Sequence, residues 1–273
     1  MELQSRLGDL KAKGLGLAAV SYDPPAVLAD FAQRRGITFP LLSDPDSRVI
    51  KSYGILNTTI APTTSYGGLV VYGVPFPGTF ILNRKGLVTA RHFEDLYQER
   101  ATVSSIFLGM GGADATSAVR HVTDQLEVIT SVSDETISAG TVFSLVLDIK
   151  PLKKVHVYAP GVVSYKPIAL RIVPLPGLKL RSPRFPPSEI YHFLPLKERV
   201  PVYQKPFRLV QELNVETSRE GQGLLRDSEK LTIKGSLDYQ ACDDKICFPP
   251  TSLPVEWTVK VRKLDSERSK AAR

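Results

Sequence analysis

Cys242 and Cys247 are the only cysteines in the 273 residues of the chain, and their type and spacing suit thiol–disulfide chemistry. In an extended chain their Cα atoms would stand about 17 Å apart. A disulfide needs Cα atoms within roughly 4.4–6.8 Å, so the intervening segment Asp243-Asp244-Lys245 must turn if the two sulfurs join. Closing so short a loop restricts the unfolded chain by only about 2 kcal/mol. Short, accessible disulfides are more often reduced and re-formed, and this favours a redox-active disulfide over a purely structural one.

The residues beside the two cysteines do not predict a strongly acidic thiol. Asp243 and Asp244 disfavour a thiolate, whereas Lys245 favours one. A zinc site is not expected, because His121, His156 and His192 are widely scattered and zinc ligands normally show close paired spacing. The sequence therefore predicts no metal and no cofactor.

Composition narrows the function classes. Lys and Arg exceed Asp and Glu by 35 to 28, a net charge of +7, but the basic residues are scattered and not gathered into runs. Nucleic-acid binding is therefore not expected. No stretch approaches about 18 consecutive apolar residues, so no membrane span is predicted. The first 14 residues include acids and lack an apolar core, so no signal peptide is predicted in the chain as given.

The first part of the chain, residues 1–108, alternates helical patterns with buried apolar runs, which indicates an α/β layered fold. Prolines and acidic residues begin the predicted helices, and glycines end them. The predicted elements are a helix over 3–10 ended by Gly14, a strand over 15–20, a helix opened by Asp23-Pro24-Pro25 and ended by Gly36, a short helix after Asp44-Pro45 ended by Gly54, a hairpin over 79–92 turning at 83–86, and a helix over 97–108.

Four segments of this part resemble the redoxin family, the peroxiredoxins named for alkyl hydroperoxide reductase and thiol-specific antioxidant. The segments are Ala19–Asp23, Phe39–Asp44, Tyr53-Gly54 and Pro77–Gly86. The resemblance implies a thioredoxin-like fold and an antioxidant type of activity. It also implies that Pro77 is the cis-proline that faces the active site in such folds.

The chain differs from that family at the position of the family's reactive cysteine. The family carries a first strand and then a reactive cysteine at the start of its first helix, where thiolate is favoured. Residues 1–108 contain no cysteine, and the first strand is absent, so the chain as given is not expected to be a competent peroxidase. We interpret Met1 as an internal start or the result of a truncated gene model. The alternative is a non-catalytic redoxin scaffold used for binding.

The pattern changes after residue 108. Residues 109–125 open with a glycine-rich stretch and are predicted to be a linker. Residues 126–262 alternate apolar and polar positions, with prolines between the runs and no helical face, which predicts a β-sandwich with Trp257 in its core. Residues 263–273 are charged and poor in apolar residues, so a disordered tail is expected.

Three segments of this second part resemble the N-terminal domain of the disulfide-reductant transporter DsbD, also called a disulfide-bond corrector domain. The segments are His156–Gly161, Pro201–Phe207 and Leu237–Pro250. The resemblance implies an immunoglobulin-like sandwich, an extracytoplasmic or periplasmic location, and exchange with thioredoxin-fold partners. It gives Cys247 the attacking role and Cys242 the resolving role. Tyr203, Tyr239 and Phe248 are the candidates for capping or supporting the pair. The family's cysteine spacing is one residue longer.

Two hypotheses follow from these patterns. In the first, the chain is a thiol–disulfide oxidoreductase of the redoxin type, in which Cys242 and Cys247 cycle between dithiol and disulfide. In the second, it is a non-catalytic interaction module whose disulfide is structural and whose redoxin-like part is a docking surface.

Overall fold

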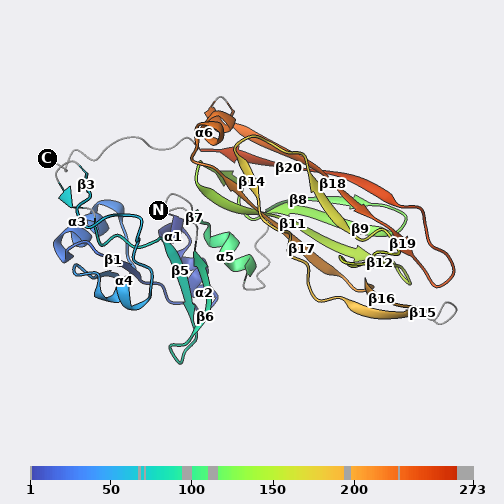
Figure 1. Ribbon diagram of the computed structural model, residues 1–273, viewed down its shortest axis with the longest axis horizontal. Helices are drawn as coiled ribbons and strands as arrows, with labels where there is room; N and C mark the ends of the chain where they lie inside the picture. Colours follow the sequence, from blue (N-terminus) through green and yellow to red (C-terminus); the bar gives the residue numbers. More distant parts are fainter. Residues whose placement is uncertain are drawn as a thin grey trace. The chain divides into compact units, whose positions relative to one another are not determined.

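Two units make up the chain, Met1–Val103 and Ser104–Arg273, and each is described by itself. The structure is a computed structural model that describes residues 2–66, 69–70, 72–93, 100–109, 116–193, 198–226 and 228–262. Figure 1 shows short helices and strand pairs in the first unit, and long strands in the second.

The first unit combines short helices with pairs of short strands. β1 and β2 form a parallel pair, and α3 connects them in the sequence. Two further pairs, β3 with β4 and β5 with β6, are antiparallel. The parallel pair joined by a helix agrees with the predicted α/β class. Its elements are α1 (Glu2–Ser5), α2 (Leu7–Ala12), β1 (Ala19–Ser21), α3 (Pro25–Arg35), β2 (Leu41–Ser43), α4 (Arg48–Ser52), β3 (Ser65–Tyr66), β4 (Leu69–Val70), β5 (Gly78–Leu82), β6 (Val88–Phe93) and β7 (Arg100–Ala101).

Local chemistry sets the ends of the helices in this unit. α3 starts with Pro25 and ends at Gly36, which has a φ of 61° and is therefore in the left-handed region that favours glycine. At α4 the buried carboxylate of Asp44 accepts hydrogen bonds from the backbone N–H groups of Arg48 and Ile50. Desolvation would raise the pKa of Asp44, but these N–H groups together hold it below its ordinary value. Both helices lie where the sequence predicts them.

The predicted hairpin is confirmed. β5 pairs with β6, and Asn83 accepts hydrogen bonds from the N–H groups of Lys85 and Leu87 across the turn. Gly86 takes a φ of 75° there. The predicted strand over 15–20 is shorter and lies at β1. Of the helix predicted over 97–108, the structure has α5 (Val103–Gly109), and residues 94–99 lie outside the described part.

The prediction that Pro77 has a cis peptide bond is wrong. No cis peptide bond occurs among the described residues, which include Pro77. The trans isomer of an X–Pro bond is favoured by about 0.5–1 kcal/mol, and β5 begins at the next residue.

The described strands of the second unit form three sheets. One has the order β14-β17-β11-β9-β8, another the order β10-β20-β18-β13, and the third the order β15-β16-β12-β19. The bounds of the elements are β8 (Thr116–Val122), β9 (Leu126–Val132), β10 (Thr136–Ile137), β11 (Thr141–Pro151), β12 (His156–Tyr158), β13 (Ala169–Ile172), β14 (Leu178–Leu180), β15 (Glu189–Phe193), β16 (Glu198–Tyr203), β17 (Phe207–Val215), α6 (Arg219–Arg226), β18 (Lys230–Tyr239), β19 (Ala241–Cys242) and β20 (Thr251–Val261).

The first two of these sheets bury one hydrophobic core between them. On β18 the buried side chains Leu231, Ile233 and Leu237 alternate with more exposed neighbours, as they do on β20 around Trp257. β11 is buried on both faces along most of its length, as a central strand is. The predicted alternating strands are therefore confirmed, and so is the burial of Trp257.

Two elements differ from the sequence prediction. β8 occupies residues 116–122 of the range predicted as linker, where Val119 and His121 belong to a strand paired with β9. α6 is a helix in a part predicted to have none. Its eight residues connect two long strands. Residues 110–115 and the tail 263–273 lie outside the described part of the chain.

The third sheet carries the cysteines. β12 lies between β16 and β19, so that Val157 is opposite Tyr203 on one side and Ala241 on the other. His156 is opposite Cys242. Figure 1 places β12, β15, β16 and β19 at the end of this unit opposite α6.

Candidate functional site

The two cysteines form a disulfide across a tight turn. Cys242 ends β19 and is opposite Cys247 in an isolated antiparallel bridge, with a Cα–Cα distance of 4.0 Å. The backbone closes the turn through a hydrogen bond from Asp243 N to Ile246 O at 2.9 Å. The Asp243 carboxylate accepts hydrogen bonds from the N–H groups of Lys245 and Ile246, both at 2.7 Å. These N–H donors lower the pKa of Asp243. The turn predicted from the spacing is therefore present.

The two sulfur-bearing residues differ sharply in exposure. Cys242 is only 2% exposed and packs with Tyr158 and Val202. Cys247 is exposed, and so is its neighbour Ile246. An incoming thiolate therefore has access to Cys247 and not to Cys242.

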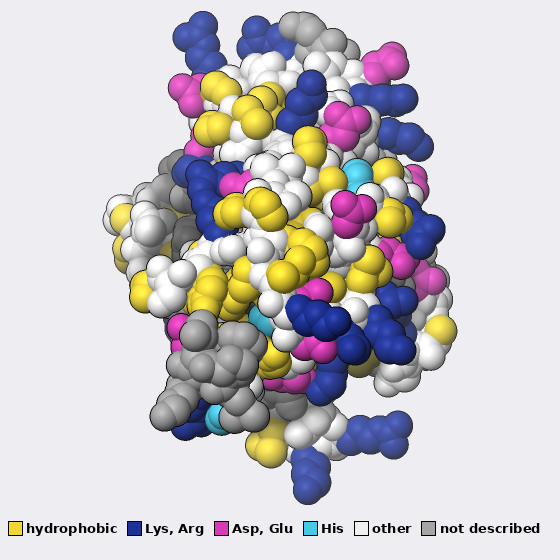
Figure 2. All heavy atoms as spheres, turned by 90° about the vertical axis from the view of Figure 1, so that its right-hand side faces the viewer, with side chains coloured by type: hydrophobic (Ala, Val, Ile, Leu, Met, Phe, Trp, Pro, Cys, Tyr) yellow, Lys and Arg dark blue, Asp and Glu magenta, His cyan; other side chains and the backbone are white. Residues whose placement is uncertain are grey.

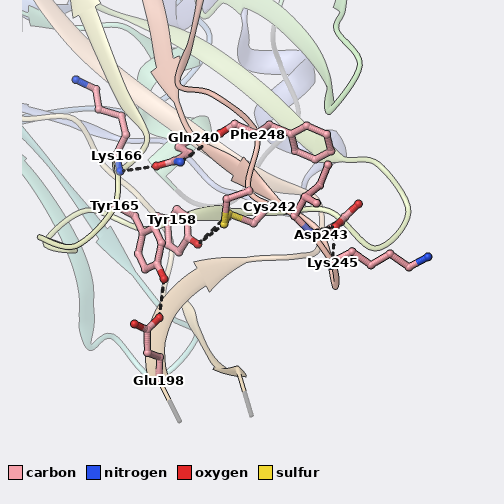
Figure 3. Close-up of a disulfide and its surroundings, with 11 residues drawn as sticks. Tyr158, Tyr165, Lys166, Glu198, Gln240, Cys242, Asp243, Lys245 and Phe248 are labelled. Carbon is pink, nitrogen blue, oxygen red and sulfur yellow. Dashed lines mark hydrogen bonds between the residues drawn. A yellow bond between two sulfur atoms is a disulfide. The ribbon is translucent and has the colours of Figure 1, made fainter. Parts of the chain in front are cut away.

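Tyr158 contacts both sulfurs from the neighbouring strand β12. Its hydroxyl oxygen lies 3.0 Å from Cys242 Sγ and 3.6 Å from Cys247 Sγ (Figure 3). Burial raises the pKa of Tyr158 well above its ordinary value, and the nearby Tyr165 and Glu198 raise it further. The phenol therefore keeps its proton at neutral pH and can donate a hydrogen bond to a thiolate.

A second tyrosine and a carboxylate continue from Tyr158 toward the surface. The rings of Tyr158 and Tyr165 are stacked, with centroids 4.1 Å apart and planes 2° from parallel. The Tyr165 hydroxyl donates a 2.6 Å hydrogen bond to Glu198 Oε2, and this bond raises the pKa of Tyr165. Tyr165 and Glu198 are partly exposed, whereas Tyr158 is buried.

His156 is the histidine nearest the pair, being opposite Cys242 in the sheet. Its ring centroid lies 5.5 Å from that of Tyr158 and 4.5 Å from that of Tyr191. Burial lowers the pKa of His156, although Asp243 opposes this shift. A neutral imidazole does not supply the positive charge that would favour a thiolate.

The loop that carries the disulfide is tied to the segment after β12. The Gln240 side chain accepts a hydrogen bond from Lys166 N at 3.1 Å and donates one to Phe248 O at 3.2 Å. Phe248 N donates to Ala241 O at 2.9 Å. These bonds hold both arms of the turn.

The three residues predicted to cap or support the pair lie in different places. Phe248 is partly buried beside the turn. Tyr203 is buried on β16, and its hydroxyl donates to Pro186 O at 2.9 Å. Tyr239 is buried in the core, and its hydroxyl lies 3.0 Å from Thr123 Oγ1. The structure therefore brings Phe248 next to the disulfide, and it places the other two hydroxyls on partners elsewhere.

Sequence reasoning missed the residues that contact the sulfur or continue from it. Tyr158 belongs to the segment that resembles the DsbD domain, and that segment is the signal that pointed to it. Tyr165 and Glu198 are 33 residues apart and carry no motif. No group of three or more His, Cys, Asp or Glu side chains that could hold a metal ion occurs among the described residues.

The described part of the first unit shows an aromatic cluster but no cysteine. The ring of Phe80 lies 5.0 Å from that of Tyr53 and 4.9 Å from that of Phe93, measured between centroids. Residues 1–241 contain no cysteine. None of the described helices is long and apolar enough to span a membrane.

Comparison with known families divides the chain in the same way. Residues 1–91 match the AhpC/TSA family, and residues 129–256 match the N-terminal domain of the thiol:disulfide interchange protein DsbD. The chain therefore has a thioredoxin-like N-terminal region and a β-rich C-terminal region that is similar to the DsbD N-terminal domain.

The similar proteins of the N-terminal region are peroxiredoxins. A Mycobacterium tuberculosis protein named as a peroxiredoxin, Rv2521, is 32% identical over 96 residues, which are 34% of this chain and 55% of that protein. Alkyl hydroperoxide reductase E of the same organism is 29% identical over 89 residues, covering 32% of this chain and 50% of that protein. The chain spans about half the length of these relatives.

Two solved structures are similar to the C-terminal region. The reduced N-terminal domain of DsbD from Neisseria meningitidis matches with a TM-score of 0.30 and 16% identity, covering 43% of this chain and 78% of that one. The N-terminal periplasmic domain of ScsB from Proteus mirabilis matches with a TM-score of 0.34 and 13% identity, covering 52% of this chain and 51% of that one.

Proposed function

We propose that the second unit is a thiol–disulfide exchange domain in which Cys247 attacks and Cys242 resolves. The observation that carries this proposal is the unequal exposure of a bonded pair. Cys242 is buried, Cys247 is exposed, and the Tyr158 hydroxyl lies within hydrogen-bond distance of Cys242 Sγ. The match to the DsbD N-terminal family supports it.

The exchange proceeds in two displacement steps. From the dithiol form, the Cys247 thiolate attacks a disulfide of the partner and forms a mixed disulfide, and one partner sulfur leaves as a thiolate. The Cys242 thiolate then attacks Cys247 Sγ, which forms the disulfide of this structure and releases the second partner sulfur. Two electrons pass from the chain to its partner, and the reverse sequence reduces the chain.

We propose that the partners are thioredoxin-fold redox proteins in an extracytoplasmic compartment. Figure 2 faces the side of the second unit that lies at the right of Figure 1, and hydrophobic side chains gather over the middle of this face, among basic and acidic ones. Val163 after β12, Ile190 on β15 and Ile246 in the cysteine turn are exposed hydrophobic residues of the segments at this end. Such a face suits a partner that docks around the exposed sulfur.

The proposal assigns the two units different roles. Residues 126–262, within the second unit, are proposed to be an immunoglobulin-like sandwich that performs the exchange. Residues 1–108 are proposed to act as a redoxin-type scaffold without peroxidase activity of its own, because they include no cysteine to attack a hydroperoxide.

A second candidate function is an interaction module with a structural disulfide. The burial of Cys242 beside Tyr158 and Val202 favours this alternative, since buried sulfur is typical of a staple.

A redox titration of the full chain separates the two candidates. The chain is equilibrated in dithiothreitol buffers of graded potential, free thiols are trapped, and the fraction of disulfide is measured by mass spectrometry. The exchange function predicts a midpoint above about −300 mV, whereas a structural disulfide would lie below that value. A midpoint below it overturns the proposal.

A further inference from the structure

The buried sulfur of Cys242 has to gain and lose a proton whenever the disulfide is reduced and re-formed. The thiol that resolves a mixed disulfide must first become a thiolate. Cys247 is exposed and can exchange its proton with water, but Cys242 is 2% exposed. A thiolate in such a place is disfavoured by desolvation. The proton of Cys242 therefore needs a route through the protein.

A row of three polar side chains begins at this sulfur. Tyr158 Oη lies 3.0 Å from Cys242 Sγ. The Tyr158 and Tyr165 hydroxyls interact with each other, and their rings are stacked at 4.1 Å. Tyr165 donates to Glu198 Oε2 at 2.6 Å. In Figure 3 these side chains run from the sulfur to the carboxylate on β16.

The directions of these hydrogen bonds suit a proton that leaves the sulfur. Tyr165 gives its hydrogen to Glu198, so its oxygen is left to accept from Tyr158. The Tyr158 oxygen in turn can accept from a Cys242 thiol. The Tyr165 donor points toward the partly exposed carboxylate, and the other two hydrogens can be arranged in the same direction.

We propose that Tyr158, Tyr165 and Glu198 form a proton relay that serves the resolving thiol of Cys242. On resolution, the Cys242 thiol gives its proton to Tyr158, Tyr158 gives its own to Tyr165, and Tyr165 gives its own to Glu198. The carboxyl group then releases a proton to water, while Cys242 Sγ bonds to Cys247 Sγ and the partner thiolate leaves. On reduction the same protons move in reverse. This inference rests on the proposed exchange function.

Tyr158 contacts the reacting sulfur, whereas Tyr165 and Glu198 act through it as positioning residues. The other titratable or charged groups around the pair are His156 on β12, Tyr191 on β15, and Asp243, Asp244 and Lys245 in the turn, with Lys154 and Lys166 on the facing loops.

The test uses the reduced full chain and 5,5′-dithiobis(2-nitrobenzoate), which separates the two chemical steps. Attack by Cys247 releases one thionitrobenzoate in a phase that depends on reagent concentration. Attack by Cys242 on the mixed disulfide releases a second one in a phase that does not. The relay predicts that Glu198→Gln and Tyr165→Phe slow the second phase at pH 7 by at least about tenfold. In both variants the rate of the first phase should stay within about twofold of the rate in the unmodified chain.

The pH profile distinguishes a relay from a structural role. In the relay a protein group takes the proton of Cys242, so the rate of the second phase does not follow the hydroxide concentration and changes little between pH 6 and pH 8. Without the relay, the rate follows the thiolate fraction of Cys242 and rises about tenfold per pH unit. Glu198→Gln is expected to show the steep profile, and Glu198→Asp to restore most of the flat one.

Glu189→Gln is the matched control. Glu189 lies on the adjacent strand β15 and pairs with Lys205 at the surface, so its loss should leave both phases unchanged. A second phase that keeps the rate and the flat profile of the unmodified chain in Glu198→Gln and in Tyr165→Phe overturns the relay. If the unmodified chain releases only one thionitrobenzoate, Cys242 does not resolve, and the proposed exchange function itself fails.

Discussion

The two units match two redox families, but only the second unit contains cysteines. The first unit has a β-hairpin, a helix that ends at a left-handed glycine, and an aromatic cluster. However, residues 1–241 contain no cysteine. The second unit places a disulfide at the end of a sheet, with one sulfur exposed and a tyrosine on the other. Similarity to a redox family and the presence of a cysteine are therefore separable properties in this chain.

The units also differ in how they bury apolar side chains. In the second unit the strands of two sheets enclose a large core, in which Phe143, Leu145 and Leu237 are fully buried. In the first unit the paired strands β1 and β2 leave Val20 and Leu42 about half exposed. The strands that carry the site also contribute to the core of the second unit, through Val157 on β12, Tyr203 on β16 and Ala241 on β19.

The largest expected effect comes from removing the exposed sulfur. Cys247→Ser leaves only the buried thiol of Cys242, so its reaction with 5,5′-dithiobis(2-nitrobenzoate) should slow by about 100-fold or more, because exchange depends on access. Cys242→Ser should keep the fast first reaction and lose the second. If Cys247→Ser reacts as fast as Cys242→Ser, the assignment of the attacking sulfur is wrong.

A core substitution tests the difference in packing. Leu237→Ala should lower the free energy of unfolding of the second unit by about 2–5 kcal/mol, because it leaves a cavity in a closed core. Leu42→Ala in the first unit, at a side chain 50% exposed, should change its stability by only about 0.5 kcal/mol.

Urea unfolding can follow the two units separately. Trp257 is the only tryptophan and lies in the core of the second unit, so its fluorescence reports that unit, while circular dichroism reports both. If Leu237→Ala and Leu42→Ala lower the free energy of unfolding by the same amount, the two units do not differ in packing.

The smallest expected effect is a pH dependence in the first unit. Asp44 has a folded pKa below its ordinary value, so its bonds to the N–H groups of α4 stabilise the fold above about pH 4. This stabilisation is lost as the pH falls through the lowered pKa. Asp44→Asn should therefore lower the thermal stability of the first unit at pH 7 and make a smaller difference at pH 3. If the difference in thermal stability between Asp44→Asn and the unmodified chain grows toward pH 3, the direction of the Asp44 pKa shift is wrong.

Local sequence patterns predicted the regular parts of both units. Alternating residues located β11, β17, β18 and β20, because a half-buried strand must repeat every two residues. Glycine and proline located the ends of α3 and the hairpin turn, since both restrict the backbone directly. The turn between the cysteines followed from the geometry that a disulfide requires.

What the sequence did not predict depends on contacts between distant segments. Nothing local distinguishes Cys242 from Cys247, and their unequal burial arises when β19 pairs with β12. Tyr165 and Glu198 come together only because β16 lies beside β12. Pro77 was misread for a related reason, since the family resemblance outweighed the ordinary preference for a trans bond.

The most direct test of the central claim is to trap the exchange on the full chain. Reduced Cys242→Ser is mixed with an oxidised thioredoxin-fold protein, the reaction is quenched with acid, and the covalent adduct is mapped by mass spectrometry. The account predicts a mixed disulfide at Cys247 that persists because no second thiol resolves it, and its absence in Cys247→Ser. If neither variant forms an adduct, or if the adduct forms at Cys242, the claim that redox exchange passes through the exposed sulfur of Cys247 is contradicted.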